Sequence, residues 1–194
     1  MPILGVIDSA KSGNLRSPAY EFIAKQTTSS SSLMTFTSIP QTYKHLEIRL
    51  SNRYSAAGVS QNGVVLSINN DQTAGNYFCN HRMQGYDGGF VASTLNAYDG
   101  YVGMLVASNP RSGTLANTFF QTVIKITDYT NSNTNKVVRS IGGGAIASSN
   151  SEVTFFTGLY FPSTSAAVTR IDIAGYSAGN FVDGTVARLY GIKG

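Results

Sequence analysis

The chain has 194 residues, of which 42% are hydrophobic, and a formal net charge of +4; this length and hydrophobic content suit one domain with a real core. Only 12% of the residues are charged, against roughly 25% in an average soluble domain, so uncharged polar residues must cover much of the surface, as in copies packed side by side or in an ordinary secreted β-protein. No apolar run approaches the ~18 residues of a membrane span, and the 14 basic residues are scattered without a known reading motif, which argues against membrane insertion and against specific nucleic-acid recognition.

Residues 1–19 combine turn formers with apolar pairs that are too short for a helical stripe. We expect an extended N-terminal arm here, followed by one domain over residues 20–194. The arm would expose apolar side chains unless another surface covers them, so we expect it to contact its own domain, a neighbouring subunit or a capsid. The side chains concerned are Ile3, Leu4, Val6, Ile7 and Leu15. The start lacks the basic region of a secretion signal and the chain has no glycosylation sequon, which favours assembly in a cytoplasm.

From residue 20 onward, apolar residues recur with a period of two, which indicates β-strands. The clearest case is the segment 44–50, in which Leu46, Ile48 and Leu50 share one face. In chain order we expect strands at 20–25, 33–38, 44–50, 64–69, 89–95, 102–107, 118–129, 136–141, 153–161, 168–174 and 184–193. Residues 76–84 fit either a helical turn or a strand.

Turn-forming Gly, Ser, Asn, Asp and Pro separate these segments, and strands do not alternate with helices. The pattern predicts an all-β fold, an antiparallel β-sandwich with a jelly-roll-like arrangement in which two sheets bury alternating residues. Segments 118–129 and 153–161 carry apolar residues on both faces, so we expect burial on both sides there.

A metal site can be drawn from Cys79, His81, Asp71 and Asp87, but a structural zinc needs four ligands and the chain has one Cys and two His. A single cysteine also excludes an internal disulfide. We expect Cys79 to be a small core residue instead. The sequence therefore predicts no metal site and no cofactor.

No catalytic residues are predicted, and we do not expect an enzyme. Glu47 and Asp172 lie on polar strand faces, where ion pairs with Arg49 or Arg170 on a neighbouring strand explain them. The nucleophile motif Gly-X-Ser-X-Gly occurs once, as GYSAG at 175–179, but a strand pattern follows it instead of the helix of a nucleophile elbow. The glycine run 142–144 lacks the helix and the Lys-Ser/Thr of a phosphate loop, so we interpret it as a bulge or a close backbone approach.

Three tyrosines surround glycine-rich turns and could form a recognition tip: Tyr86, Tyr98 and Tyr101. Packing in the core or in an interface is the alternative role for them. The absence of Trp weakens a carbohydrate-stacking role.

Three segments carry a resemblance to a known group of proteins. The stretch 36–49, with the sequence FTSIPQTYKHLEIR, resembles a segment of small virion structural proteins of tailed bacteriophages, and 183–193 and 3–15 are similar to their closing strand and N-terminal arm. Independently of this resemblance, Ile39-Pro40 predicts a corner between two strands, because Pro cannot donate a hydrogen bond to a ladder.

The resemblance implies a component of a phage particle, located in the virion and assembled in the host cytoplasm. We expect a capsid decoration or cement subunit that forms homo-oligomers, with a trimer as one option, and that contacts other virion proteins such as the major capsid protein or tail proteins. The alternative is a tail fibre or tail-tip protein that binds host-surface glycans through aromatic loops. A glycan depolymerase is the third and most distant option.

Overall fold

The computed structural model describes residues 19–55, 63–85, 90–95, 102–108, 110, 117–147, 150–175 and 179–194. The described segments form twelve strands and one 3-10 turn, Ala74–Asn76. The strands are β1 (Tyr20–Thr28), β2 (Leu33–Phe36), β3 (His45–Asn52), β4 (Gly63–Ile68), β5 (Tyr77–Gly85), β6 (Phe90–Leu95), β7 (Met104–Ser108), β8 (Phe120–Ile126), β9 (Lys136–Ala147), β10 (Asn150–Tyr160), β11 (Ile171–Gly175) and β12 (Thr185–Ile192). No helix among these residues is long and apolar enough to cross a membrane.

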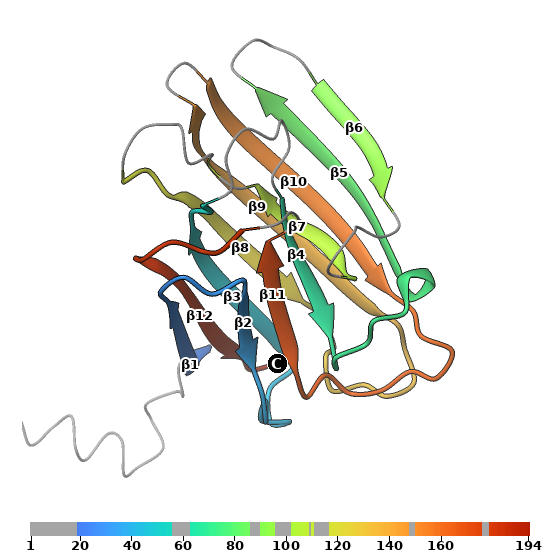
Figure 1. The fold of residues 1–194 in the computed structure, drawn as a ribbon. Coiled ribbons are helices and arrows are strands. Elements are labelled where there is room, and N and C mark those ends of the chain that lie inside the picture. The colour runs from blue at the N-terminus through green and yellow to red at the C-terminus, as the bar shows by residue number, and fades with distance from the viewer. Residues whose placement is uncertain are drawn as a thin grey trace, which may run out of the picture.

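Two antiparallel sheets make up the fold (Figure 1). The larger sheet has the order β1-β12-β3-β8-β9-β10-β5-β6, and the smaller one has the order β2-β11-β4-β7. The expected all-β fold with two antiparallel sheets is thus confirmed. The jelly-roll-like arrangement and the division into arm and domain stay predictions.

The core lies between the two sheets and follows the period-two pattern of the sequence. Leu46, Ile48 and Leu50 of β3 are at most 1% exposed, and Ile171 and Ile173 of β11 are fully buried opposite them. Alternate residues of a strand face the same side, so each strand contributes one apolar row to this layer. Cys79 is buried in the same core, as expected.

Each expected strand overlaps a strand of the structure. The segment 76–84, which fits a helical turn or a strand, contains both: Asn76 ends the 3-10 turn, and residues 77–84 form most of β5. Strand β9 continues past its expected end at residue 141 through the glycine run. A Cβ on Gly142 would lie 2.6 Å from the Thr122 hydroxyl and 2.9 Å from the backbone carbonyl oxygen of Gln121. Of the two predicted alternatives, a bulge or a close backbone approach, the close approach is therefore confirmed.

The predicted corner at Ile39-Pro40 is confirmed as the link between the sheets. It follows β2 of the smaller sheet and precedes β3 of the larger one. Ile39 is 4% exposed, and its N–H donates to the carbonyl oxygen of Thr169 at 3.1 Å. The buried Tyr129 donates its hydroxyl to the Pro40 carbonyl. These contacts fix the angle at which the chain passes from one sheet to the other.

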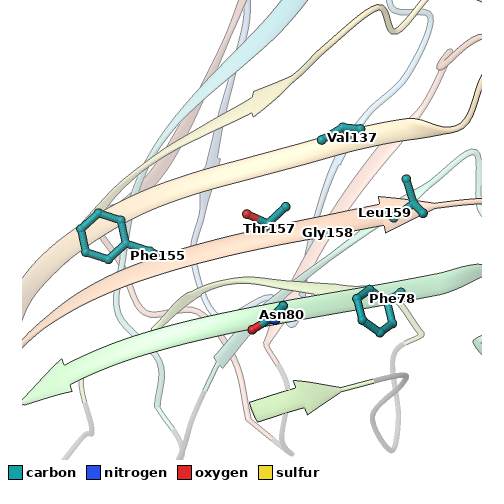
Figure 2. Close-up of a pocket in the computed structure, with 7 residues that line it drawn as sticks. All are labelled: Phe78, Asn80, Val137, Phe155, Thr157, Gly158 and Leu159. Carbon is teal, nitrogen blue, oxygen red and sulfur yellow. The ribbon is translucent and has the colours of Figure 1, made fainter. Parts of the chain in front are cut away.

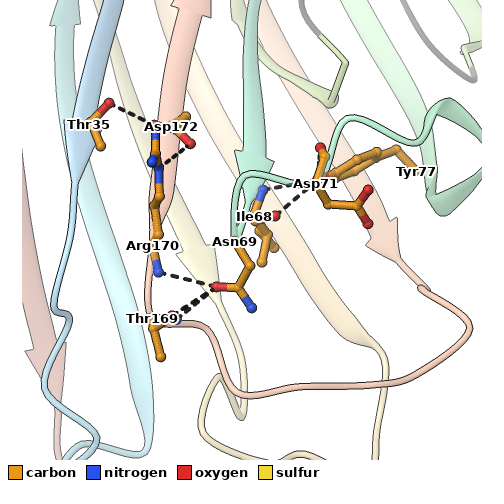
Figure 3. Close-up of polar contacts among 8 residues, drawn as sticks. All are labelled: Thr35, Ile68, Asn69, Asp71, Tyr77, Thr169, Arg170 and Asp172. Atoms are coloured by element: carbon orange, nitrogen blue, oxygen red, sulfur yellow. Dashed lines mark hydrogen bonds and ion pairs between the residues drawn. The ribbon is translucent and has the colours of Figure 1, made fainter.

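Asn69, directly after β4, holds the segment that leads into β11 (Figure 3). Its side-chain oxygen accepts hydrogen bonds from the backbone N–H of Thr169 at 2.9 Å and of Arg170 at 3.2 Å, and its amide donates to the Ala167 carbonyl at 2.8 Å. Asn69 has φ +54°, a left-handed conformation that Asn tolerates better than most residues. One side chain therefore aligns the two central strands of the smaller sheet.

Asp71 organises the turn between β4 and β5. One carboxylate oxygen accepts from the Asn76 amide at 2.7 Å and from the Tyr160 hydroxyl at 3.0 Å, and the other accepts from the Thr73 N–H at 2.8 Å. Partial burial raises the pKa of Asp71, but the hydrogen bonds from Asn76 and Thr73 outweigh it, and the net pKa lies below the ordinary 3.8. Burial and the same carboxylate raise the pKa of the Tyr160 hydroxyl.

The variant Asn69→Ala should lower the free energy of unfolding by about 1–3 kcal/mol more than Asn70→Ala, because it loses three hydrogen bonds, two of them partly buried. Asn70 is the matched control, since it also has a positive φ (+57°) and is exposed. Chemical denaturation of both variants measures the difference. Equal destabilisation would show that only the backbone conformation matters.

The stability contribution of Asp71 should depend on pH in a defined direction. A carboxylate with a lowered pKa in the folded state stabilises the fold above its unfolded pKa and loses this effect as the pH falls through the folded pKa. Asp71→Asn should therefore be less stable than the parent chain at pH 7, and the gap should narrow below about pH 4. Thermal melts between pH 7 and pH 2.5 test this, and a constant gap would contradict it.

Candidate interaction surface

The outer face of the larger sheet, which points away from the core, carries exposed apolar side chains and a group of basic side chains. The register places residues from distant segments in common cross-strand rows. One row runs from Lys25 of β1 through Arg188, Arg49, Val123 and Ile141 to Phe155 of β10. Side chains directly opposite on one face lie about 5 Å apart at Cβ, so each row is a continuous line of contacts.

One part of this face is apolar, and we call it the apolar patch. Its most exposed members are Ile141 (52%), Phe155 (50%), Val153 (47%), Phe78 (40%) and Val123 (37%). Expected burial on both faces of segments 118–129 and 153–161 is therefore wrong. The smaller sheet packs on the inner face, so β8 and β10 bury only every second residue.

A groove runs along the apolar patch between β9, β10 and β5 (Figure 2). It has a volume of about 500 Å³. The lining residues are Phe78, Asn80, Val137, Phe155, Thr157, Gly158 and Leu159. Figure 2 shows the Phe155 ring on β10 toward one end, the Phe78 ring on β5 toward the other, and the Thr157 hydroxyl and the Asn80 amide between them. The groove can accept apolar groups and offers two polar contacts at its centre.

The other part of the outer face is positively charged, and we call it the basic cluster. It consists of Lys25, Arg49, Lys125, Arg139 and Arg188. Within it, the first row places the side chains of Lys25, Arg188 and Arg49 directly opposite one another on three neighbouring strands. Lys125 and Arg139 form a second opposed pair in the adjacent row.

Glu47 lies within the basic cluster and is 4% exposed. Its carboxylate pairs with Arg49 at 2.9 Å and with Lys125 at 4.0 Å. The hydrogen bond to Glu47 raises the pKa of Arg49, whose guanidinium also lies 4.7 Å from the centre of the Tyr190 ring. Arg49 is thus held between an anion and an aromatic ring.

The expected ion pairs of Glu47 and Asp172 exist, but their geometry differs from the prediction. Arg49 lies two residues along the same strand as Glu47, and Arg170 precedes Asp172 by two residues, with nitrogen–oxygen distances of 2.9 and 2.8 Å. Alternate residues share a face and long guanidinium groups can fold back along it, so no neighbouring strand is needed. Thr35 on β2 donates its hydroxyl to Asp172 at 2.7 Å (Figure 3).

The candidate contact and recognition residues of the sequence analysis lie outside the described residues. These are Ile3, Leu4, Val6, Ile7 and Leu15 of the expected arm and Tyr86, Tyr98 and Tyr101 of the expected tip. Of the drawn metal ligands, Cys79 lies in the core and Asp71 in the turn described above, whereas Asp87 also lies outside the described residues. Within the described residues, no group of three or more His, Cys, Asp and Glu side chains could hold a metal ion.

Neither the apolar patch nor the basic cluster was identified from the sequence. The usable signal for the patch was the presence of apolar residues on both faces of 118–129 and 153–161, which indicates an interface as readily as a core. The basic cluster had no local signal, because its members lie between residues 25 and 188 and meet only through the register.

The double variant Ile141→Thr/Phe155→Thr should bind less of a hydrophobic fluorescent dye and lose less than about 2 kcal/mol of stability, because both side chains are half exposed. Phe156→Ala is the contrasting control; this neighbour is 3% exposed and should cost about 3–5 kcal/mol. Dye titration and denaturation measure both effects. A loss of stability in the double variant as large as that of Phe156→Ala would mean that these residues serve the fold.

No family model, no curated protein and no solved structure matches this chain.

Proposed function

We propose that this chain is a structural subunit of a bacteriophage virion, a capsid decoration or cement protein that attaches through the outer face of its larger sheet. The observation that carries the proposal is the apolar patch. Monomeric proteins rarely leave large apolar surfaces uncovered, and exposed apolar side chains that gather on one sheet face mark interaction sites. The resemblance of segments 3–15, 36–49 and 183–193 to small virion proteins supports the proposal that the partner is part of a phage particle.

The area of the outer face suits a stable protein contact. Eight strands at ~4.8 Å spacing span about 35 Å, and four rows at ~7 Å spacing span about 20 Å. The resulting area of about 700 Å² is close to the ~800 Å² that each partner contributes to a standard interface. In this proposal, copies of the chain join one another through the sandwich and the arm, and the outer face contacts other virion proteins such as the major capsid protein.

The state of the carboxylates supports a structural role over an enzymatic one. Glu47, Asp128 and Asp172 are held in ion pairs with Arg49, Lys44 and Arg170. Asp71 accepts two hydrogen bonds within its own turn and a third from the hydroxyl of Tyr160 at the end of β10. Carboxylates engaged in this way are poorly placed to act as the acid and base of a glycan depolymerase.

A tail fibre or tail-tip protein that binds host-surface glycans is the second candidate, and the groove is the observation that favours it. Two Phe rings beside a central amide and a hydroxyl, as in Figure 2, could stack on a sugar ring and bond its hydroxyl groups. Selective binding on a glycan array that Phe155→Thr abolishes would support this candidate, whereas a cement subunit should bind no sugar selectively.

Electron microscopy of purified particles of the encoding phage, labelled with an antibody against this chain, tests the leading proposal. We expect label over the head, and we expect Ile141→Thr/Phe155→Thr chains to be incorporated at a level reduced by about tenfold or more, since a centrally buried aromatic contact is worth more than about 1.4 kcal/mol. Label found only at the tail would refute the decoration role. An absence of label from all particles would refute the virion role as a whole.

A further inference from the structure

The basic cluster brings like charges together at a cost to the fold. Lys25, Arg188 and Arg49 are direct neighbours in one cross-strand row, and Lys125 is opposite Arg139 in the next. Like charges directly opposite one another destabilise a sheet. The sheet itself provides one anion for this set, the carboxylate of Glu47.

The charges of the cluster are only partly compensated. Glu47 is the one carboxylate on the outer face of β1, β12, β3, β8 and β9, and it is already engaged by Arg49 and Lys125. None of the ion pairs among the described residues includes Lys25, Arg139 or Arg188. Five cations against one carboxylate leave an excess as large as the formal net charge of the entire chain, +4.

Aromatic rings border the cluster and add apolar contact area. Phe22 is 58% exposed and packs edge-on against Tyr190, with ring centres 5.8 Å apart. Tyr20 is 39% exposed, and the guanidinium carbon of Arg49 lies 5.8 Å from the centre of its ring. The cluster is therefore a charged surface with exposed rings at the β1 edge and the apolar patch at its other side.

We propose that the basic cluster binds a carboxylate-rich surface of a partner protein, whose apolar side chains at the same time pack on the apolar patch. This inference rests on the proposed role as a docking subunit and specifies the chemistry of the partner. Carboxylates of the partner lie over Arg188, Lys25 and Arg139, and its apolar groups fill the groove between Phe78 and Phe155.

A protein surface fits this arrangement better than the other polyanions. The row that begins with Lys25, Arg188 and Arg49 continues into Val123, Ile141 and Phe155, so the occupant must present anions and aliphatic groups side by side. The phosphate backbone of a nucleic acid offers no apolar complement to Val and Ile side chains, and an anionic polysaccharide offers little. A second copy of the chain bound through this same cluster would place cations against cations.

The test uses the purified full chain and random poly(Glu,Tyr), a soluble copolymer that carries carboxylates and aromatic groups. The variant Arg139→Gln/Arg188→Gln should weaken binding about five- to tenfold at 150 mM salt, since it removes two contacts of exposed charges. The matched control Lys44→Gln/Lys193→Gln removes the same charge away from the cluster and should change affinity less than twofold. The variant Ile141→Thr/Phe155→Thr should weaken the binding of poly(Glu,Tyr) but leave the binding of poly-L-glutamate unchanged.

Several results would overturn the inference. Tighter binding of single-stranded poly(dT) or of heparin than of poly(Glu,Tyr) at equal charge would identify a nucleic-acid or polysaccharide surface instead. Equal weakening by the control variant, or the absence of binding to poly(Glu,Tyr), would show that the cluster is not a site. These outcomes are separate from those of the virion experiment. The chain can be present on phage heads without binding acidic polymers, and it can bind acidic polymers without being present in particles.

Discussion

Antiparallel pairing in the eight-stranded sheet, together with the packing of the four-stranded sheet on one of its faces, is the constraint on which the rest of the structure depends. Pairing sets which residues become neighbours, and alternation sets which of them face the core. Strand β3 shows both effects, because Leu46, Ile48 and Leu50 fill the core while Glu47 and Arg49 lie on the outer face. A shift of register by one residue would exchange the two sets.

The two faces of the larger sheet therefore carry different tasks. The inner face, with the smaller sheet, supplies apolar burial. Asn69 aligns two strands within the smaller sheet, and the corner at Ile39-Pro40 links the two layers. The outer face presents side chains that are held by rigid strands, which fixes their positions more accurately than a loop would. A surface formed in this way suits a large contact area rather than the few converging groups of a catalytic centre.

Most of the fold could be predicted from the sequence, because period-two alternation and turn residues are local signals. The expected strands, the corner and the close approach at the glycine run all have counterparts in the structure. The candidate interaction surface could not be predicted, for two physical reasons. First, the sequence does not distinguish an apolar residue that lies in the core from one that lies on the surface, as Phe155 does. Second, residues such as Lys25 and Arg188 become neighbours only when β1 pairs with β12. The partner of Glu47 lies on its own strand and not on a neighbouring one, because the long side chain of Arg49 can fold back over two residues on the same face.

The position of β12 has a consequence for how the protein is made. This strand comes last among the described strands, yet it pairs between β1 and β3 and places Arg188 in the centre of the basic row. During translation, β1 has no partner in its own sheet until residues 185–192 have left the ribosome. The basic cluster is consequently completed only once β12 has been synthesised, so a chain that stops before residue 185 would lack Arg188, the middle residue of the row Lys25, Arg188 and Arg49.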